Sequence, residues 1–243
     1  MRECYEIAEK VIEVDSLYPA VHDYCAEYRS KKTADFAIAI TREDLIQEQT
    51  LVDQERMAEG LEPIRMEPDY LEITAALRLI SERMPTYDTF LFHSSAVAVD
   101  GMAYLFAALS GTGKSTHTRL WREMLGKRAV MVNDDKPFIR VQDEKAMVFG
   151  TPWDGKHRLS QNIAVPIKAI CLLERDRENH IEPVCFRDVY PRILQQMYRP
   201  FDPIAMAQSL SLLDRLFDSI SLYRLGCNME PEAACVAYYV MKG

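Results

Sequence analysis

The apolar positions of this 243-residue chain recur at two different spacings, which predicts a mixture of strands and helices. Short apolar or alternating runs are typical of strands, and they lie at 5–14, 35–40, 91–99, 104–107, 129–132, 138–141, 146–149, 167–173 and 221–225. Apolar residues three and four positions apart predict helices at 17–28, 41–59, 69–83 and 202–218, one helix that ends before Gly126, and a last helix from Pro231.

This order of elements predicts an α/β or α+β protein in two parts. Residues 1–85 are expected to form a small mixed α/β subdomain, because strand and helix patterns come before two polar helical stretches. In residues 86–243, helical stretches separate short apolar runs, as in a larger domain built on a sheet. Pro85 marks the boundary, since proline ends the preceding helix.

An Asp-Gly pair joins two of the apolar runs, at Asp100 and Gly101. Asp-Gly between apolar runs predicts a two-residue hairpin turn. In an unbroken ladder Val99 then faces Met102, and His93 faces Ala108. The register therefore predicts that His93 lies at the start of the loop that follows the second strand. A lone histidine in an apolar run also has a structural interpretation, and both stay open.

That loop, 108–116, has the sequence Ala-Leu-Ser-Gly-Thr-Gly-Lys-Ser-Thr. It resembles a phosphate-binding loop, although Ala108 stands where the strict pattern has glycine. In such a loop the backbone N–H groups point at the phosphates of a nucleotide, the lysine adds positive charge, and the following hydroxyl binds magnesium. The expected nucleotide-binding residues are Ser110, Gly111, Thr112, Gly113, Lys114, Ser115 and Thr116.

Two adjacent carboxylates follow the next apolar run, at Asp134 and Asp135. Ligands of α/β proteins bind outside the carboxyl ends of strands, so this is a suitable place for a metal or a catalytic base. We expect Ser115, Asp134 and Asp135 to bind Mg²⁺. Together with Lys114 and His93, the two aspartates are also the candidate catalytic residues. The sequence does not decide which aspartate is the base.

Composition limits the kinds of partner that the protein can bind and the cellular compartment that we expect for it. A net charge of −8 argues against a nucleic-acid partner, whose phosphates require clustered Lys and Arg. The sequence contains no run of 18 apolar residues, which a membrane span would require. Its first residues are acidic, unlike those of a signal peptide, so we expect a cytosolic protein. The six cysteines have no metal-ligand spacing, which indicates reduced, structural thiols. Whether the chain forms a homo-oligomer is left open.

On these residues the chain resembles the HPr kinase/phosphorylase family, which shares its nucleotide fold with phosphoenolpyruvate carboxykinases. The serine-preceded loop, the spacing from His93 to Lys114, and the pair Asp134–Asp135 are similar to that family over about 90–140. The resemblance implies a P-loop core with a mixed sheet and a functional histidine at position 93. Ser94 follows that histidine where the family usually has glycine, so the chain is interpreted as a divergent member.

The predicted activity is ATP-dependent phosphoryl transfer to a hydroxyl, with ATP and Mg²⁺ as ligands. The acceptor is open: a Ser or Thr of a protein or peptide, or a small metabolite. A non-catalytic ATP- or GTP-binding regulator is the alternative. The loop 151–158 has two interpretations of equal weight, a substrate-binding loop with a basic cluster or a surface turn whose Trp153 packs on the sheet.

Overall fold

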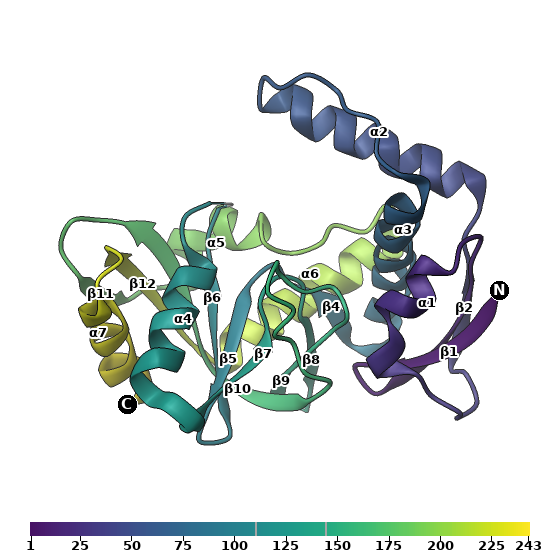
Figure 1. The fold of residues 1–243 in the computed structure, drawn as a ribbon. Helices are drawn as coiled ribbons and strands as arrows, with labels where there is room; N and C mark the ends of the chain where they lie inside the picture. Colours follow the sequence, from purple (N-terminus) through teal and green to yellow (C-terminus); the bar gives the residue numbers. More distant parts are fainter. Residues whose placement is uncertain (110, 144) are drawn as a thin grey trace. The chain divides into compact units, whose positions relative to one another are not determined.

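A computed structural model of the chain describes residues 1–109, 111–143 and 145–243. They form two compact units, 1–83 and 84–243, each with its own sheet (Figure 1). Among the described residues, no helix is both long enough and apolar enough to cross a membrane.

Unit 1 (residues 1–83) is a three-stranded sheet with three α-helices. The strands β1 (Arg2–Ile7), β2 (Lys10–Asp15) and β3 (Phe36–Ala39) lie in that order, with β1 antiparallel and β3 parallel to β2. The helices are α1 (Ala20–Tyr24), α2 (Arg42–Ala58) and α3 (Pro68–Arg83). The α/β character expected for this region is therefore observed.

Two predictions for unit 1 were wrong. The single strand predicted at 5–14 is a hairpin of β1 and β2, because Ala8 and Glu9 turn the chain with positive φ angles of 49° and 56°. The sequence has no glycine or asparagine there to signal the turn. The helix predicted at 17–28 is only the short α1 followed by a 3₁₀ turn at Ala26–Tyr28. The helix predicted from Thr41 is confirmed, with a capping box between Thr41 and Asp44.

Unit 2 (residues 84–243) contains a curled mixed sheet. Its strands are β4 (Thr89–Leu91), β5 (Ser95–Val99), β6 (Met102–Ala107), β7 (Ala129–Asn133), β8 (Phe138–Gln142), β9 (Lys145–Phe149), β10 (Ala164–Arg175), β11 (His180–Pro183) and β12 (Ser221–Cys227). The order is β4-β8-β9-β10-β6-β5-β7, with β12 on β10 and β11 on β12. The first residues of β10 pair with β9, and the remainder lies parallel to β6 and β12.

Helices cover both faces of this sheet. They are α4 (Lys114–Leu125), α5 (Phe186–Leu194), α6 (Pro203–Ser219) and α7 (Pro231–Lys242). Alternate residues of β6 and β10 point to opposite faces, so Phe106 and Cys171 pack with α4 and α7 in one buried cluster. Leu105 and Ile170 pack with α5 and α6 in another. The two clusters make a three-layer α/β arrangement, as the fold class predicts.

Most elements of unit 2 follow the predicted pattern. The hairpin at Asp100-Gly101 is confirmed, with Val99 opposite Met102. The helix predicted to end before Gly126 is α4, and Gly126 follows it with a φ of 57°. The single strand predicted at 91–99 is wrong, because β4 ends at Leu91 and pairs with β8, whereas β5 begins at Ser95 and pairs with β6 and β7. Among the described residues, the pattern also missed the short β11 and the helix α5, which carries Pro191 in its interior. Proline inside a helix is the reason that the pattern there did not indicate one.

Candidate active site

The loop 108–113 joins β6 to the N-terminus of α4, and its conformation depends on glycine. Gly111 and Gly113 have φ angles of 74° and 120°, which side chains other than hydrogen rarely allow. Gly113 is the N-cap of α4, and no side chain caps that end. The first amides of a 12-residue helix are thus directed outward with the positive end of the helix dipole. Ser110 lies outside the described residues.

Lys114 is the first residue of α4 and is only 9% exposed. Its Nζ donates a hydrogen bond to the carbonyl of Ala108 at 3.0 Å, across its own loop. Burial lowers the pKa of this lysine, although the nearby Asp135 and Asp134 act in the opposite direction. Among the described residues Lys114 forms no ion pair. A buried cation without an anionic partner is costly, so this position favours binding of an anion.

Asp134 follows β7 and is 5% exposed. Its Oδ1 accepts a hydrogen bond of 2.5 Å from Ser95 Oγ. Burial raises the pKa of Asp134, and hydrogen bonds from the Ser95 and Ser115 hydroxyls only partly offset this. Asp134 has no cationic partner among the ion pairs of the described residues. The structure thus brings Ser115 and Asp134 together.

Asp135 has different surroundings. Its Oδ1 lies 2.9 Å from His93 Nε2, and its Oδ2 lies 3.8 Å from Lys136 Nζ. Burial raises the pKa of Asp135, but the hydrogen bond from His93 and the charge of Lys136 outweigh burial and keep the pKa below its usual value. The hydrogen bond to Asp135 raises the pKa of His93, yet burial, Lys136 and Lys114 together bring it below its usual value. At neutral pH this pair is therefore a neutral imidazole bonded to an ionised carboxylate.

The predicted pairing of His93 with Ala108 is wrong in its detail. The β5–β6 ladder ends at Ser95 and Phe106, and the preceding chain leaves the hairpin. In place of the ladder bond that the register predicts, the His93 N–H donates to the carbonyl of Gln196 at 2.7 Å.

Gln196 links the two residues that the register had paired directly. Its side chain, with the amide turned to donate, reaches the carbonyl of His93 at 3.2 Å and that of Ala108 at 3.1 Å. The neighbouring residue Phe92 forms a β-bridge to Met197, which fixes this part of the chain beside Gln196. His93 and Ala108 are therefore connected through Gln196.

The loop 151–158 supports the aspartates from the other side. Asp154 accepts backbone hydrogen bonds from Asp134 at 2.8 Å, Gly155 at 2.8 Å and Ser160 at 2.7 Å. A Cβ atom at Gly155 would lie 2.9 Å from the Asp134 carboxylate, so the close approach of the loop requires glycine there. Trp153 is buried, while Lys156 and His157 line the cleft described next. The burial of Trp153 agrees with the second interpretation of this loop, and substrate binding by Lys156 and His157 stays a prediction.

One cleft of about 620 Å³ brings most of the predicted site residues together. Its lining consists of His93, Gly111, Gly113, Lys114, Ser115, Thr116, Asp134, Asp135, Asp154, Gly155, Lys156 and His157. Thr112 faces a neighbouring cavity of about 430 Å³ on the other side of the loop. Leu120, Leu173, Cys227 and Met229 supply apolar walls to that second cavity.

Sequence reasoning missed the residues that hold the aspartates and His93 in place. Ser95, Asp154 and Gln196 each act through hydrogen bonds to atoms far away in the sequence. Asn133 does the same, since its side chain donates to the carbonyls of Thr151 and Trp153. A signal was available only for Asn133 and Asp154, as polar residues next to the predicted site or inside the suspected loop. Nothing in the sequence singled out Gln196.

The residues present fit a magnesium ion bound together with phosphate. Among the described residues, no group of three or more His, Cys, Asp or Glu side chains could hold a metal ion alone. Magnesium, however, usually takes one or two carboxylates and completes its ligands with water and substrate phosphates. Asp134 and Ser115, hydrogen-bonded to each other, supply such a partial ligand set.

Comparisons with known proteins give little. No family model and no curated protein matches the sequence. Among solved structures, the HPr(Ser) kinase/phosphatase from Coxiella burnetii is similar to this chain, with 9% sequence identity and a TM-score of 0.35 over 63% of this chain and 99% of that one. So distant a likeness carries no weight for function, and the resemblance to that family stays a prediction.

Proposed function

We propose that this protein is an ATP-dependent phosphotransferase that transfers the γ-phosphoryl group to a hydroxyl. The observation that carries the proposal is a pair of buried, oppositely charged groups that do not pair with each other. Lys114 and Asp134 are 9% and 5% exposed, they line one cleft, and among the described residues neither forms an ion pair. Burial shifts the pKa of each toward its neutral form. A phosphate for Lys114 and a cation for Asp134 would stabilise both charges at once.

The phosphates would lie on the N-terminus of α4. The end of this helix has no side-chain cap, and Gly111 and Gly113 line the cleft beside it. Their amides would donate to the phosphates, and the helix dipole favours an anion there. Lys114 would exchange the carbonyl of Ala108 for the β- and γ-phosphate oxygens. Phosphoryl transfer depends mainly on positioning and charge stabilisation, and these groups supply both.

Asp134 and Ser115 would hold Mg²⁺, which when bound neutralises charge on the phosphate oxygens. Ser95 fixes the orientation of Asp134 through the hydrogen bond between its Oγ and Oδ1. Asp154 fixes the backbone of Asp134. The carboxylate therefore has a defined position before any ligand arrives, which reduces the reorganisation needed in the reaction.

Asp135 and His93 would activate the acceptor. In the transfer, the acceptor oxygen forms a bond to the γ-phosphorus while the bond from that phosphorus to the β–γ bridging oxygen breaks. The hydroxyl proton goes to Asp135, and ADP leaves with the electron pair of the broken bond. His93 donates its Nε2–H to Asp135 and so orients the base. This assigns the two aspartates separate roles.

The second cavity would take the base of the nucleotide. It borders the same loop through Gly111, Gly113 and Thr116, so a nucleotide can extend from one cavity into the other. Its apolar walls suit the faces of an aromatic base. Arg175 closes one side of this cavity and donates a hydrogen bond to the carbonyl of Gly111.

The proposal is tested by measuring ADP release from purified protein with ATP and Mg²⁺, with and without hydroxyl acceptors. Lys114→Ala should abolish turnover and weaken ATP binding by more than about a hundredfold, because a buried charge-assisted contact is lost. The protein should stay folded, since Lys114 belongs to neither apolar cluster of unit 2. Lys127→Ala, an exposed lysine after α4, is the matched control and should behave like the parent.

Two results would contradict the proposal. Unchanged ATP affinity in Lys114→Ala, measured by calorimetry, would show that the phosphates do not bind at this loop. ATP binding that depends on Lys114, without ADP release under any acceptor condition and without any effect of the aspartates, would instead indicate a non-catalytic nucleotide-binding regulator.

A further inference from the structure

Helix α2 of unit 1 buries little of its apolar surface. Of its 17 residues only Leu45 and Glu48 are buried, whereas Ile46 is 67% exposed and Met57 is 55% exposed. A helix of this length in water usually depends on packing of an apolar face. Leu61 and Ile64, in the segment that follows α2, are also exposed, at 47% and 43%. Of these exposed apolar residues, Ile46 and Ile64 line the groove described next.

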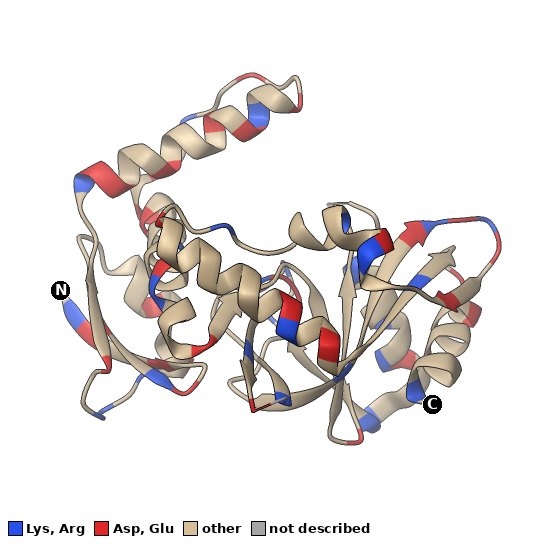
Figure 2. Ribbon diagram, turned by 180° about the vertical axis from the view of Figure 1, so that it is seen from behind, with Lys and Arg blue, Asp and Glu red and all other residues tan. Residues whose placement is uncertain are grey.

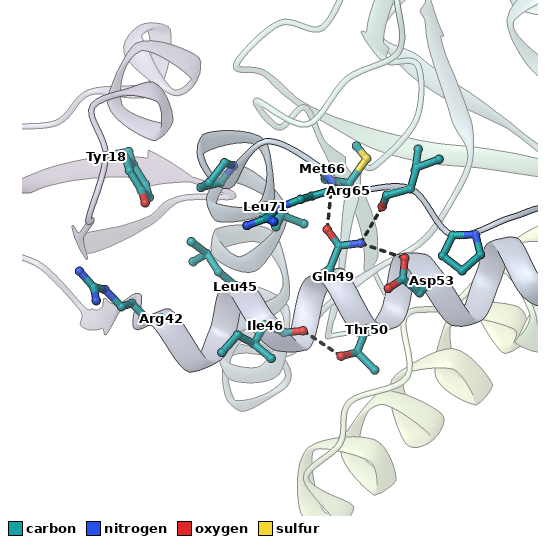
Figure 3. Close-up of a pocket in the computed structure, with 13 residues that line it drawn as sticks. Tyr18, Arg42, Leu45, Ile46, Gln49, Thr50, Asp53, Arg65, Met66 and Leu71 are labelled. Carbon is teal, nitrogen blue, oxygen red and sulfur yellow. Dashed lines mark hydrogen bonds between the residues drawn. The ribbon is translucent and has the colours of Figure 1, made fainter.

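A groove of about 660 Å³ runs along this face of α2 (Figure 3). Its walls are α2 and the segment 63–68, with Leu71 of α3 and Tyr18 at one end. Gln49 holds the two walls together: its amide donates to the carbonyl of Ile64 at 2.8 Å, and its Oε1 accepts from the N–H of Met66 at 3.0 Å. The groove is therefore a built feature of unit 1, held by specific hydrogen bonds.

Two arginines line the groove without ionic partners. Among the described residues, no ion pair or side-chain hydrogen bond includes Arg42 or Arg65, and both are exposed. Arg42 is the first residue of α2, where a positive charge opposes the helix dipole and does not stabilise the helix. The carboxylate in the lining, Asp53, already accepts a hydrogen bond from Gln49 at 2.9 Å. The charge available to a ligand of the groove is therefore positive.

We infer that this groove docks a peptide segment of a partner protein, with apolar side chains along the groove and carboxylates opposite Arg42 and Arg65. Between Arg42 and Asp53 the groove follows α2 for about 16 Å at 1.5 Å per residue. That length matches roughly five residues of extended chain, which span about 3.3 Å each. The inference uses unit 1 alone and does not depend on the proposed phosphoryl transfer.

The charge of unit 1 favours a peptide of a partner protein over a second copy of this chain as the occupant of the groove. Residues 1–83 carry 19 Asp and Glu against 10 Lys and Arg, and Figure 2 shows acidic positions along most of α2. Two copies docked through this unit would bring like charges together, which is unfavourable. A peptide carboxylate opposite Arg42 or Arg65 would form an ion pair there, whereas salt screens the acidic residues that lie more than about 10 Å away. The two arginines at the groove therefore favour a peptide that carries negative charge.

The test is selection of a random dodecapeptide display library on the immobilised full chain. We expect the enriched peptides to share apolar residues next to Asp or Glu. The best peptide, synthesised with a fluorescent label, should bind in solution by anisotropy. Ile46→Asp should weaken its binding about thirtyfold, the effect expected for loss of an apolar anchor at the centre of an interface.

Charge reversal distinguishes a lost contact from a misfolded variant. The double variant Arg42→Glu with Arg65→Glu should lose the acidic peptide and gain affinity for the same peptide with Lys in place of its carboxylates. Glu at the start of α2 favours the helix dipole, so the variant should fold. Lys31→Glu reverses a charge on an exposed loop of the same unit, outside the groove, and should bind the original peptide normally.

Three outcomes would overturn the inference. Enrichment of no peptide, or of peptides that bind Ile46→Asp as well as the parent, would show that the groove is not a docking site. Equal binding of the acidic and lysine-substituted peptides would remove the role of the arginines. A concentration-dependent dimer in sedimentation that Ile46→Asp dissociates would identify a second copy as the occupant. Calorimetry of ATP binding, run on the same variants, reports on unit 2 separately.

Discussion

The cleft contains two adjacent carboxylates, Asp134 and Asp135, whose pKa values are shifted in opposite directions by their surroundings. On one side, burial raises the pKa of Asp134, whose side chain accepts hydrogen bonds from the hydroxyls of Ser95 and Ser115. On the other side, His93 and Lys136 overcome burial and lower the pKa of Asp135. One peptide bond separates these residues, so the difference arises from the elements that surround them and not from the local sequence.

This difference supports the separate roles that we propose for two identical side chains. A carboxylate without a cationic partner gains most from a bound metal, because the metal supplies the missing positive charge. A carboxylate already held by a neutral imidazole stays ionised and keeps a fixed direction, which suits proton transfer. On this ground we propose that Asp134 binds the metal and that Asp135 is the base.

Replacing each aspartate with asparagine tests this assignment and should have the largest effect. Both Asp134→Asn and Asp135→Asn should lower turnover on the order of a hundredfold or more, the contribution typical of a positioned acid–base group. Only Asp134→Asn should also raise the Mg²⁺ concentration needed for half-maximal turnover. Titration of Mg²⁺ at saturating ATP measures this directly.

ATP binding without Mg²⁺ should hardly change in either variant. Asp214→Asn, an exposed position on α6, is the matched control and should keep full turnover. An increased Mg²⁺ requirement in Asp135→Asn with a normal one in Asp134→Asn would reverse the assignment. Normal turnover in both variants would place the chemistry elsewhere.

In the proposed mechanism His93 acts by orienting Asp135, so its replacement should have a smaller effect than replacement of the aspartates. His93→Ala should lower turnover by roughly tenfold to a hundredfold with little change in ATP affinity. His93→Gln keeps a side-chain N–H donor and should recover part of that loss. Thermal unfolding of both variants, measured beside turnover, decides whether His93 is merely structural: normal turnover in a destabilised protein would end its assignment as a positioning residue.

Local signals predicted the elements that form the cleft. The glycines of the loop, the helix stop at Gly126 and the Asp-Gly hairpin each depend on backbone conformation, which residue type limits strongly. For that reason β5, β6 and α4 were predictable, and with them the neighbourhood of Lys114. The confirmed cap at Thr41 belongs to the same class of local signals.

Long-range contacts were not predictable in the same way. The hairpin register placed His93 opposite Ala108, but the ladder ends at Ser95 because the preceding chain pairs with Met197 instead. No local pattern shows that a segment far along the chain competes for the same hydrogen bonds. Gln196 and the contact of Gly155 with Asp134 depend on tertiary packing in the same way.

Gly155→Ala tests the position of the Asp134 carboxylate without changing any charged residue. The added Cβ would lie 2.9 Å from Oδ2 and 3.3 Å from the Cβ of Asp134, so the carboxylate must turn or the loop must move. We expect turnover to fall about tenfold, since small displacements of positioned groups are costly. The Mg²⁺ requirement should rise, as in Asp134→Asn but less. A similar loss of turnover with a normal Mg²⁺ requirement would show that the loop acts on the Asp135 side instead.

The pH dependence of turnover should show the smallest effect, and it concerns the Asp135 side. Because the pKa of His93 lies below its usual 6.5, more than half of the molecules keep a neutral imidazole at pH 6.5. Protonation at lower pH would turn the pair into an ion pair and weaken the base, so turnover should be level from about pH 8 to 7 and decline only at a pH below about 6.5. Acid unfolding is a separate event, since burial lowers the pKa of His117 to about 4 and stability falls as pH drops from 6.5 toward that value. Circular dichroism measured at each pH distinguishes acid unfolding from a loss of turnover in the folded protein. A midpoint of the pH dependence of turnover above about pH 7 would show that Asp135 holds His93 as the imidazolium.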